Sequence, residues 1–300
     1  MNKCYFYTFM LIMILSGFFS AGKSFIRFEG EIPASINKDH LEREYIRIWN
    51  RLSPDTEIDT GNLYIIFYHH QAGKQYGVRL PEWGGGGAIG TDSIIIPVNR
   101  RRVIGENYNQ TAVHELVHIV VNRAFGTVYV PRWLHEGLAM VLSGEIPSEG
   151  QLLLSRAVWS GKIFSLDTIE YVNRFNASGA MLAYATSHAA VLYLIETYGM
   201  CGIVELLDNA RGRRSFPSAL ENIYGVGPDK LNEEIREHII KSYRLKILSD
   251  ERYIFALIGI LALLAIIVSR FRYRRRLREM AEIESREFSA ESMNREDPLI

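Results

Sequence analysis

Cysteine is scarce in this sequence: the chain has 300 residues and 2 cysteines. A small secreted domain held together by disulfides needs several pairs, so the fold must depend on a hydrophobic core. Net charge is also absent, because 34 basic and 34 acidic residues cancel. The chain therefore lacks the basic excess that would predict a nucleic-acid partner. A hydrophobic content of 48% is typical of a folded protein and excludes a disordered one.

The N-terminal segment has no charged residue between Lys3 and Lys23. An uncharged apolar run extends to Phe19, and the small residues 20–22 follow it. This order is typical of a secretory signal peptide and predicts cleavage before Lys23. An uncleaved anchor helix is the alternative, although the run is short for a membrane span. We expect residues 1–22 to be a signal peptide, so that the following domain is exported.

A second uncharged run extends from Tyr253 to Ser269 and is followed by six arginines between Arg270 and Arg278. As a helix it would rise about 25 Å, close to the hydrocarbon thickness of a bilayer. A buried core helix is the alternative, but the basic flank favours a transmembrane helix with its arginines in the cytoplasm. The sequence therefore predicts a single-pass protein of a bacterial cell membrane, with residues 23 to about 252 outside the cytoplasm. The basic, then acidic, tail over residues 270–300 is expected to be disordered and cytoplasmic.

Residues 23–250 contain no repeat or low-complexity linker, and we interpret them as one domain of the α+β class. The hydrophobic periodicity predicts strands at 25–32, 62–68 and 92–98 and helices at 39–52, 107–125, 183–198, 203–210, 216–223 and 230–247. Gly199 is expected to end one of these helices. Pro97 favours an edge position for its strand. The four glycines at 84–87 give either a flexible turn or room for a second backbone, such as a substrate peptide.

Chemistry is concentrated between Thr111 and Ala139, where a His-Glu-x-x-His run occupies residues 114–118. Residues four apart lie on one face of a helix, so His114 and His118 can direct two imidazoles at one zinc ion. Glu115 lies about 100° around the helix, where it can reach a water molecule without binding the metal. The pattern predicts one Zn²⁺ ion and a general base. The alternative is that a histidine is a surface residue and no metal binds.

Three residues are candidates for the third zinc ligand: His135, Glu136 and Glu145. A metzincin would continue with glycine at position 121 and histidine at position 124. This chain has Val121 and Ala124 at those positions, which excludes that class of peptidase.

The segment WLHEGLA at residues 133–139 resembles the Trp-Leu-x-Glu-Gly-x-Ala signature of gluzincins, the zinc metallopeptidases that include thermolysin and the alanyl aminopeptidases. Over roughly residues 60–240 the chain is similar to bacterial peptidase-MA-like domains, which share these two helices and a later helix comparable with residues 183–199. The resemblance implies a zincin-like fold: a small mixed sheet with an edge strand over the active-site helix, and a helical C-terminal part. It also implies Glu136 as third ligand and residues 84–98 as the substrate-aligning edge.

Two further residues are candidates through this resemblance, and two positions depart from it. Tyr184 and His188, one turn apart, could stabilise the oxyanion, as a tyrosine or histidine does in gluzincins; a half-buried helix face is the alternative. A thermolysin-like site has aspartate four residues after the third ligand, where this chain has Met140, so another acceptor must orient His114. Glu82 lies near the edge strand without the aminopeptidase motif, so exopeptidase action is not supported.

The combined interpretation is a membrane-anchored zinc metallopeptidase, which uses Glu115 to activate water and acts on a peptide or protein substrate. Two other hypotheses retain the zinc site. One is a non-catalytic zinc-binding scaffold domain of the cell envelope. The other is a zinc hydrolase that acts on a non-peptide amide, such as a cell-wall cross-link.

Overall fold

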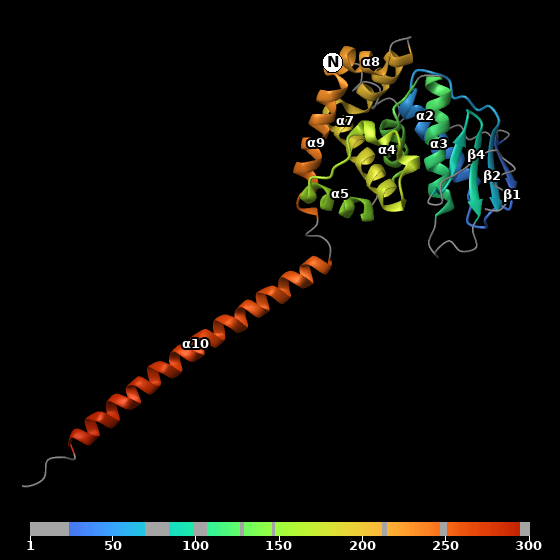
Figure 1. Cartoon of the computed structure of the whole chain (residues 1–300). Helices are drawn as coiled ribbons and strands as arrows, with labels where there is room; N and C mark the ends of the chain where they lie inside the picture. Colours follow the sequence, from blue (N-terminus) through green and yellow to red (C-terminus); the bar gives the residue numbers. More distant parts are fainter. Residues whose placement is uncertain are drawn as a thin grey trace, which may run out of the picture. The chain divides into compact units, whose positions relative to one another are not determined.

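The chain separates into two units, of which the first ends at Arg244 and the second begins at Leu245. The computed structural model describes residues 24–69, 84–98, 107–126, 129–145, 148–211, 215–246 and 251–294. The first unit has its strands in the N-terminal part and only helices from residue 107 onward among the described residues (Figure 1). The predicted α+β class is therefore confirmed.

Four strands form one mixed sheet in the order β1-β2-β4-β3. The parallel strands are β1 (Ile26–Gly30), β2 (Leu63–His69) and β4 (Ser93–Val98), and β3 (Gly87–Ile89) pairs antiparallel with β4. The edge strands are thus β1 and β3, and β4 lies inside the sheet, so the predicted edge position for the strand that contains Pro97 is wrong. Because β3 pairs only with residues 93–95, Pro97 lies past its end, where β4 has one neighbour among the described residues.

Two helices lie on one side of this sheet (Figure 1). In α2 (Lys38–Leu52) the buried residues recur every three or four positions, as expected for a helix with one face on the core. In α3 (Tyr108–Phe125) most residues from Ala112 onward are buried, because α3 contacts β3 and β4 on one side and α4 on the other. Aromatic contacts join both helices to the sheet region, such as Phe67 with Tyr108 at 6.5 Å between ring centroids.

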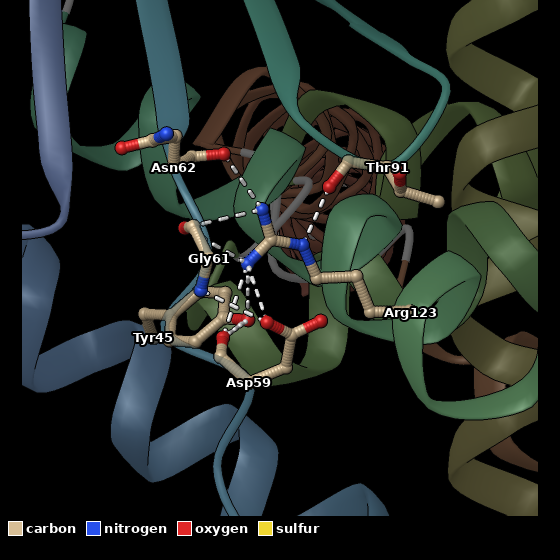
Figure 2. A network of polar contacts seen from close by, with 6 residues as sticks. All are labelled: Tyr45, Asp59, Gly61, Asn62, Thr91 and Arg123. Atoms are coloured by element: carbon tan, nitrogen blue, oxygen red, sulfur yellow. Dashed lines mark hydrogen bonds and ion pairs between the residues drawn. The ribbon is translucent and has the colours of Figure 1, made fainter.

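The C-terminal turn of α3 is fixed by Arg123 (Figure 2). Its guanidinium donates hydrogen bonds to the carbonyl oxygens of Asp59 and Asn62, both at 3.0 Å. It also donates to the Thr91 carbonyl at 2.5 Å and to the Tyr45 hydroxyl at 3.0 Å. These partners come from α2, from the segment before β2 and from the turn between β3 and β4. One nearly buried cation therefore holds α3 in register with the edge of the sheet.

The rest of the first unit is helical. Its elements are α4 (Arg132–Ser143), α5 (Ser148–Ser160), α6 (Leu166–Ile169), the 3-10 helix η2 (Val172–Arg174), α7 (Ala177–Arg211), α8 (Phe216–Tyr224) and α9 (Pro228–Tyr243). Helix α4 contacts both α3 and α7. A Cβ atom on Gly137 would lie 2.4 Å from the Ser187 carbonyl oxygen, so glycine permits α4 and α7 to approach this closely. Gly199, with φ 73°, interrupts α7 where we expect a helix to end.

The second unit contains helix α10 (Glu251–Asn294). Its stretch from Tyr253 to Ser289 is long and apolar enough to cross a membrane, and none of that apolar window is buried. Helix α7 meets the same criterion of length and composition, but 39% of its window is buried, as in a core helix. The structure differs from the expected disordered tail, because α10 continues through residues 270–294. This segment is rich in arginine and glutamate, which favour helix, and Arg275 pairs with Glu279 one turn away at 3.0 Å.

Candidate active site

Helix α3 carries the three residues of the His-Glu-x-x-His run. The helix begins with Asn107 as its N-cap, whose side chain accepts a hydrogen bond from the Gln110 amide. The imidazoles of His114 and His118 are 5.1 Å apart between ring centroids, one turn along the same face. Glu115 is 6% exposed. The predicted placement of both rings on one face is therefore observed.

Helix α4 brings Glu136 to the two imidazoles. Its Oε2 atom lies 3.4 Å from Nε2 of His114 and 3.6 Å from Nε2 of His118. Ligand atoms bound 2.0–2.2 Å from a tetrahedral zinc ion are roughly 3.3–3.6 Å from one another. The donor atoms of these three residues all lie within 4.8 Å of one another. Their chemistry and spacing fit a zinc ion.

The other two candidates for third ligand have different positions. The Oε2 atom of Glu145 lies 2.8 Å from Nδ1 of His114. This is the ring nitrogen that does not face Glu136. His135 stacks on His118, with ring centroids 4.4 Å apart and planes at 10°. Packing on that ring leaves His135 half-buried. The Nδ1 atom of His118 is buried and has no hydrogen-bond partner among the residues that the structure describes.

Burial and the neighbouring charges shift the pKa values of this group. Burial favours neutral Glu136, but hydrogen bonds from His114 and His118 outweigh it and hold the Glu136 pKa well below the usual value. Burial likewise favours a neutral ring at His114, yet hydrogen bonds to Glu136 and Glu145 hold its pKa well above the usual value. Burial raises the pKa of Glu115, against the opposing effect of both imidazoles. A raised pKa suits a carboxylate that must accept a proton near neutral pH.

The glycine-rich segment approaches Glu115 closely. A Cβ atom on Gly86 would lie 3.1 Å from Oε1 of Glu115 and 3.2 Å from the carbonyl oxygen of Ile95. Such contacts are tighter than most side chains tolerate, so the absence of a side chain lets this backbone lie beside the carboxylate. Gly86 therefore lets the sheet edge lie beside the Glu115 carboxylate, and the alignment of a substrate backbone along this edge stays a prediction. Glu82 lies outside the described residues.

Both oxyanion candidates lie on α7 but meet different surroundings. Burial raises the pKa of Tyr184, and the Glu136 carboxylate adds to this effect, while a hydrogen bond that the Arg132 side chain donates to the Tyr184 hydroxyl opposes it. His188 is buried, its pKa is lowered by burial, and Glu145 opposes that shift. Both side chains are therefore in the forms that can donate a hydrogen bond without a charge.

Arg132 belongs to this site, although the sequence pattern did not single it out. One guanidinium nitrogen, Nη2, lies 3.1 Å from Oε1 of Glu136. The four-residue spacing of Arg132 and Glu136 could have indicated this pair, because residues four apart on a helix are neighbours. It was missed because the gluzincin signature begins at Trp133, one residue later.

A buried His-His-Glu group on two adjacent helices, with a second acid beside it and a sheet edge against that acid, defines a zinc-metallopeptidase site. The sequence profile of the Peptidase MA superfamily matches residues 51–241. The chain belongs to the Peptidase MA superfamily and is a zinc metallopeptidase. A search of curated proteins finds no match to the chain.

Proposed function

We propose that this metallopeptidase cleaves peptide bonds in extracytoplasmic peptides or proteins, with Glu115 as general base. The observation that carries the proposal is the position of Glu115, buried beside the His114, His118 and Glu136 group and against Gly86. A zinc ion held by that group would polarise the scissile carbonyl and make water more acidic. The glycine-rich edge would align an extended substrate backbone along β3.

In the proposed mechanism, the chain's own residues move and hold protons. Glu115 accepts a proton from the attacking water and transfers it to the leaving amine. The neutral Tyr184 hydroxyl donates a hydrogen bond to the oxygen that becomes negative, and His188 is the second candidate for that role. His114 donates its Nδ1–H in a hydrogen bond to the Glu145 carboxylate, which would leave Nε2 unprotonated for the metal.

The decisive variant is Glu115→Gln in the full-length protein. It keeps the size of the side chain and removes the base, so the variant should still bind zinc while peptide hydrolysis falls by about 10²–10⁴-fold. Metal content and cleavage of a mixed peptide library are measured side by side, with and without chelator. Hydrolysis at the wild-type rate by Glu115→Gln would show that the mechanism is wrong.

The same measurements separate the two other hypotheses. A wild-type protein that binds zinc and cleaves no peptide supports the scaffold hypothesis. A hydrolase of non-peptide amides would instead cleave isolated cell-wall cross-links, and the product masses identify the bond that is cleaved.

The proposed location is a cell membrane, with residues 23–250 outside the cytoplasm. Support comes from the uncharged run at residues 253–269, which lies in an exposed helix, and from the six arginines that follow it. In this proposal residues 1–22 direct export and are removed. The site then acts on substrates of the cell envelope.

A further inference from the structure

The two oxygen atoms of Glu136 have different partners. Oε2 faces His114 and His118 at 3.4 and 3.6 Å. Oε1 faces Nη2 of Arg132 at 3.1 Å, in an ion pair between residues one turn apart on α4. The Glu136 side chain is 8% exposed, so water competes little for either oxygen.

The stability of helix α4 does not account for an arginine at this position. Arg132 occupies the first turn, where the helix dipole disfavours a positive charge. The N-cap, Pro131, makes no side-chain capping bond. Instead, Oε1 of Glu170 accepts a hydrogen bond from the Arg132 backbone amide at 2.6 Å. Glu170 therefore caps the helix in place of Pro131. The Arg132 side chain takes no part in this capping.

That side chain is held from several directions. Nη2 also donates a hydrogen bond to Oδ1 of Asn173 at 3.2 Å. The Tyr184 hydroxyl accepts a hydrogen bond from the same guanidinium. Asn173 lies on η2 and Tyr184 on α7, so α4 and two later elements meet at one planar group. The Nε atom of Arg132 is buried and has no partner in the described part of the chain. The fork geometry of arginine suits such a junction, whereas lysine offers a single point charge.

We propose that Arg132 is a positioning residue, which makes Glu136 bind the metal through one oxygen and holds the Tyr184 hydroxyl beside it. A carboxylate with two free oxygens can bind a cation through both. Pairing Oε1 with a guanidinium leaves Oε2 as the metal-binding oxygen, so a bound metal would have three protein ligand atoms and an open position for water. This inference rests on the proposed function, because it presupposes the metal site.

The test replaces zinc with cobalt(II), whose visible absorption is stronger in four-coordinate than in five-coordinate sites. Full-length wild type, Arg132→Met and Arg132→Lys are compared. We expect the intense four-coordinate spectrum in the wild type and a weaker, five-coordinate spectrum in both variants, because Glu136 then supplies its second oxygen. With zinc bound, kcat should fall at least about tenfold and KM should change little, since the change is at the metal.

Arg174→Met is the matched control, because Arg174 is an exposed arginine that lies over the Tyr171 ring near the same segment. It should keep the wild-type spectrum and kcat. A wild-type cobalt spectrum in either Arg132 variant would overturn the proposal, and Arg132→Lys provides this test even if Arg132→Met fails to fold. A five-coordinate spectrum in the wild type would also overturn the proposal while leaving the metal site intact, whereas no bound cobalt in the wild type would overturn the metal site and the proposed function with it.

Discussion

Glu145 occupies a place in the site that helix spacing does not predict. In a thermolysin-like arrangement the orienting carboxylate lies four residues after the third ligand, where this chain has the buried Met140. Here α4 ends at Gly144, whose φ of 72° turns the chain, and the Glu145 amide donates to the Met140 carbonyl at 2.9 Å. The turn brings the Glu145 carboxylate to Nδ1 of His114. The open question of what orients His114 is answered by a residue just beyond the helix.

Removing this carboxylate should weaken metal binding. We expect Glu145→Ala to lower zinc affinity by about 10–100-fold, because the orienting hydrogen bond to His114 is lost. Glu145→Gln should lose less, since an amide oxygen can still accept that bond. Affinity is measured by competition with a chromophoric chelator. Glu149→Ala, an exposed glutamate nearby, is the control, and equal affinities for both alanine variants would contradict this role.

The raised pKa of His114 predicts a pH dependence of metal binding. Hydrogen bonds to Glu136 and Glu145 outweigh burial, so the metal-free ring stays protonated above its ordinary pKa. Below that raised pKa, zinc must displace a proton, and apparent affinity should fall about tenfold for each unit of decreasing pH. Calorimetry at pH 7 in buffers of different ionisation enthalpy counts the protons released. A binding heat that is independent of the buffer would show that no proton is displaced.

At the scale of single residues, the sequence predicts part of the site. His114, Glu115 and His118 follow from helical spacing, because their geometry is local. Glu136 comes from a family resemblance, since spacing alone left three candidates. The stacking of His135 depends on the crossing of α3 and α4, which no local pattern encodes. The predictable residues are those that one helix positions by itself.

At the scale of elements, the orientation of α3 depends on contacts with short, irregular segments. The Arg123 side chain is 5% exposed and joins α3 to two strand connections (Figure 2). The long helices at residues 39–52 and 107–125 are predictable because their periodicity is strong. The three-residue strand β3 is not, because only pairing with β4 makes it a strand. The predicted edge position of the strand at residues 92–98 is therefore wrong, because β3 lies beyond it.

Replacing Arg123 tests how much that junction stabilises the fold. We expect Arg123→Met to lower the free energy of unfolding by about 1.5–3 kcal/mol, because several acceptors, most of them on exposed residues, lose hydrogen bonds from one charged and nearly buried donor. Arg123→Lys should recover only part, since one ammonium cannot reach all of these acceptors. Chemical denaturation of the full-length protein gives both values. Arg43→Met, at an exposed arginine of α2, should change stability by less than about 0.5 kcal/mol; similar losses at both positions would contradict the argument.

At the scale of the whole molecule, α10 exposes a continuous apolar surface that a water-soluble helix would bury. Its centre includes Leu261 and Leu264, which are 57% and 51% exposed. The run of arginines that follows has the charge expected beside an anionic leaflet. These features were readable from sequence because hydropathy is a local property. The helix beyond residue 270 was not, because the same charged composition also fits a disordered tail.

Arginine substitutions test the proposed span. In bacterial cells, the full-length chain should fractionate with membranes and resist alkaline extraction. Leu261→Arg combined with Leu264→Arg should release it, because each arginine near the helix centre costs about 2.5–3.5 kcal/mol for insertion. Met280→Arg, outside the predicted span, is the control and should remain in the membrane. A doubly substituted chain that still resists extraction would contradict the span at 253–269.

The contact at Gly137 has a mechanical consequence. A helix pair in which one backbone touches the other has no room for side chains to rearrange between them, so α4 and α7 should move as one body. Glu136, Arg132 and Tyr184 then keep their mutual distances during catalysis. A substrate must therefore fit between this fixed helix pair and the glycine-rich segment that lies beside Glu115.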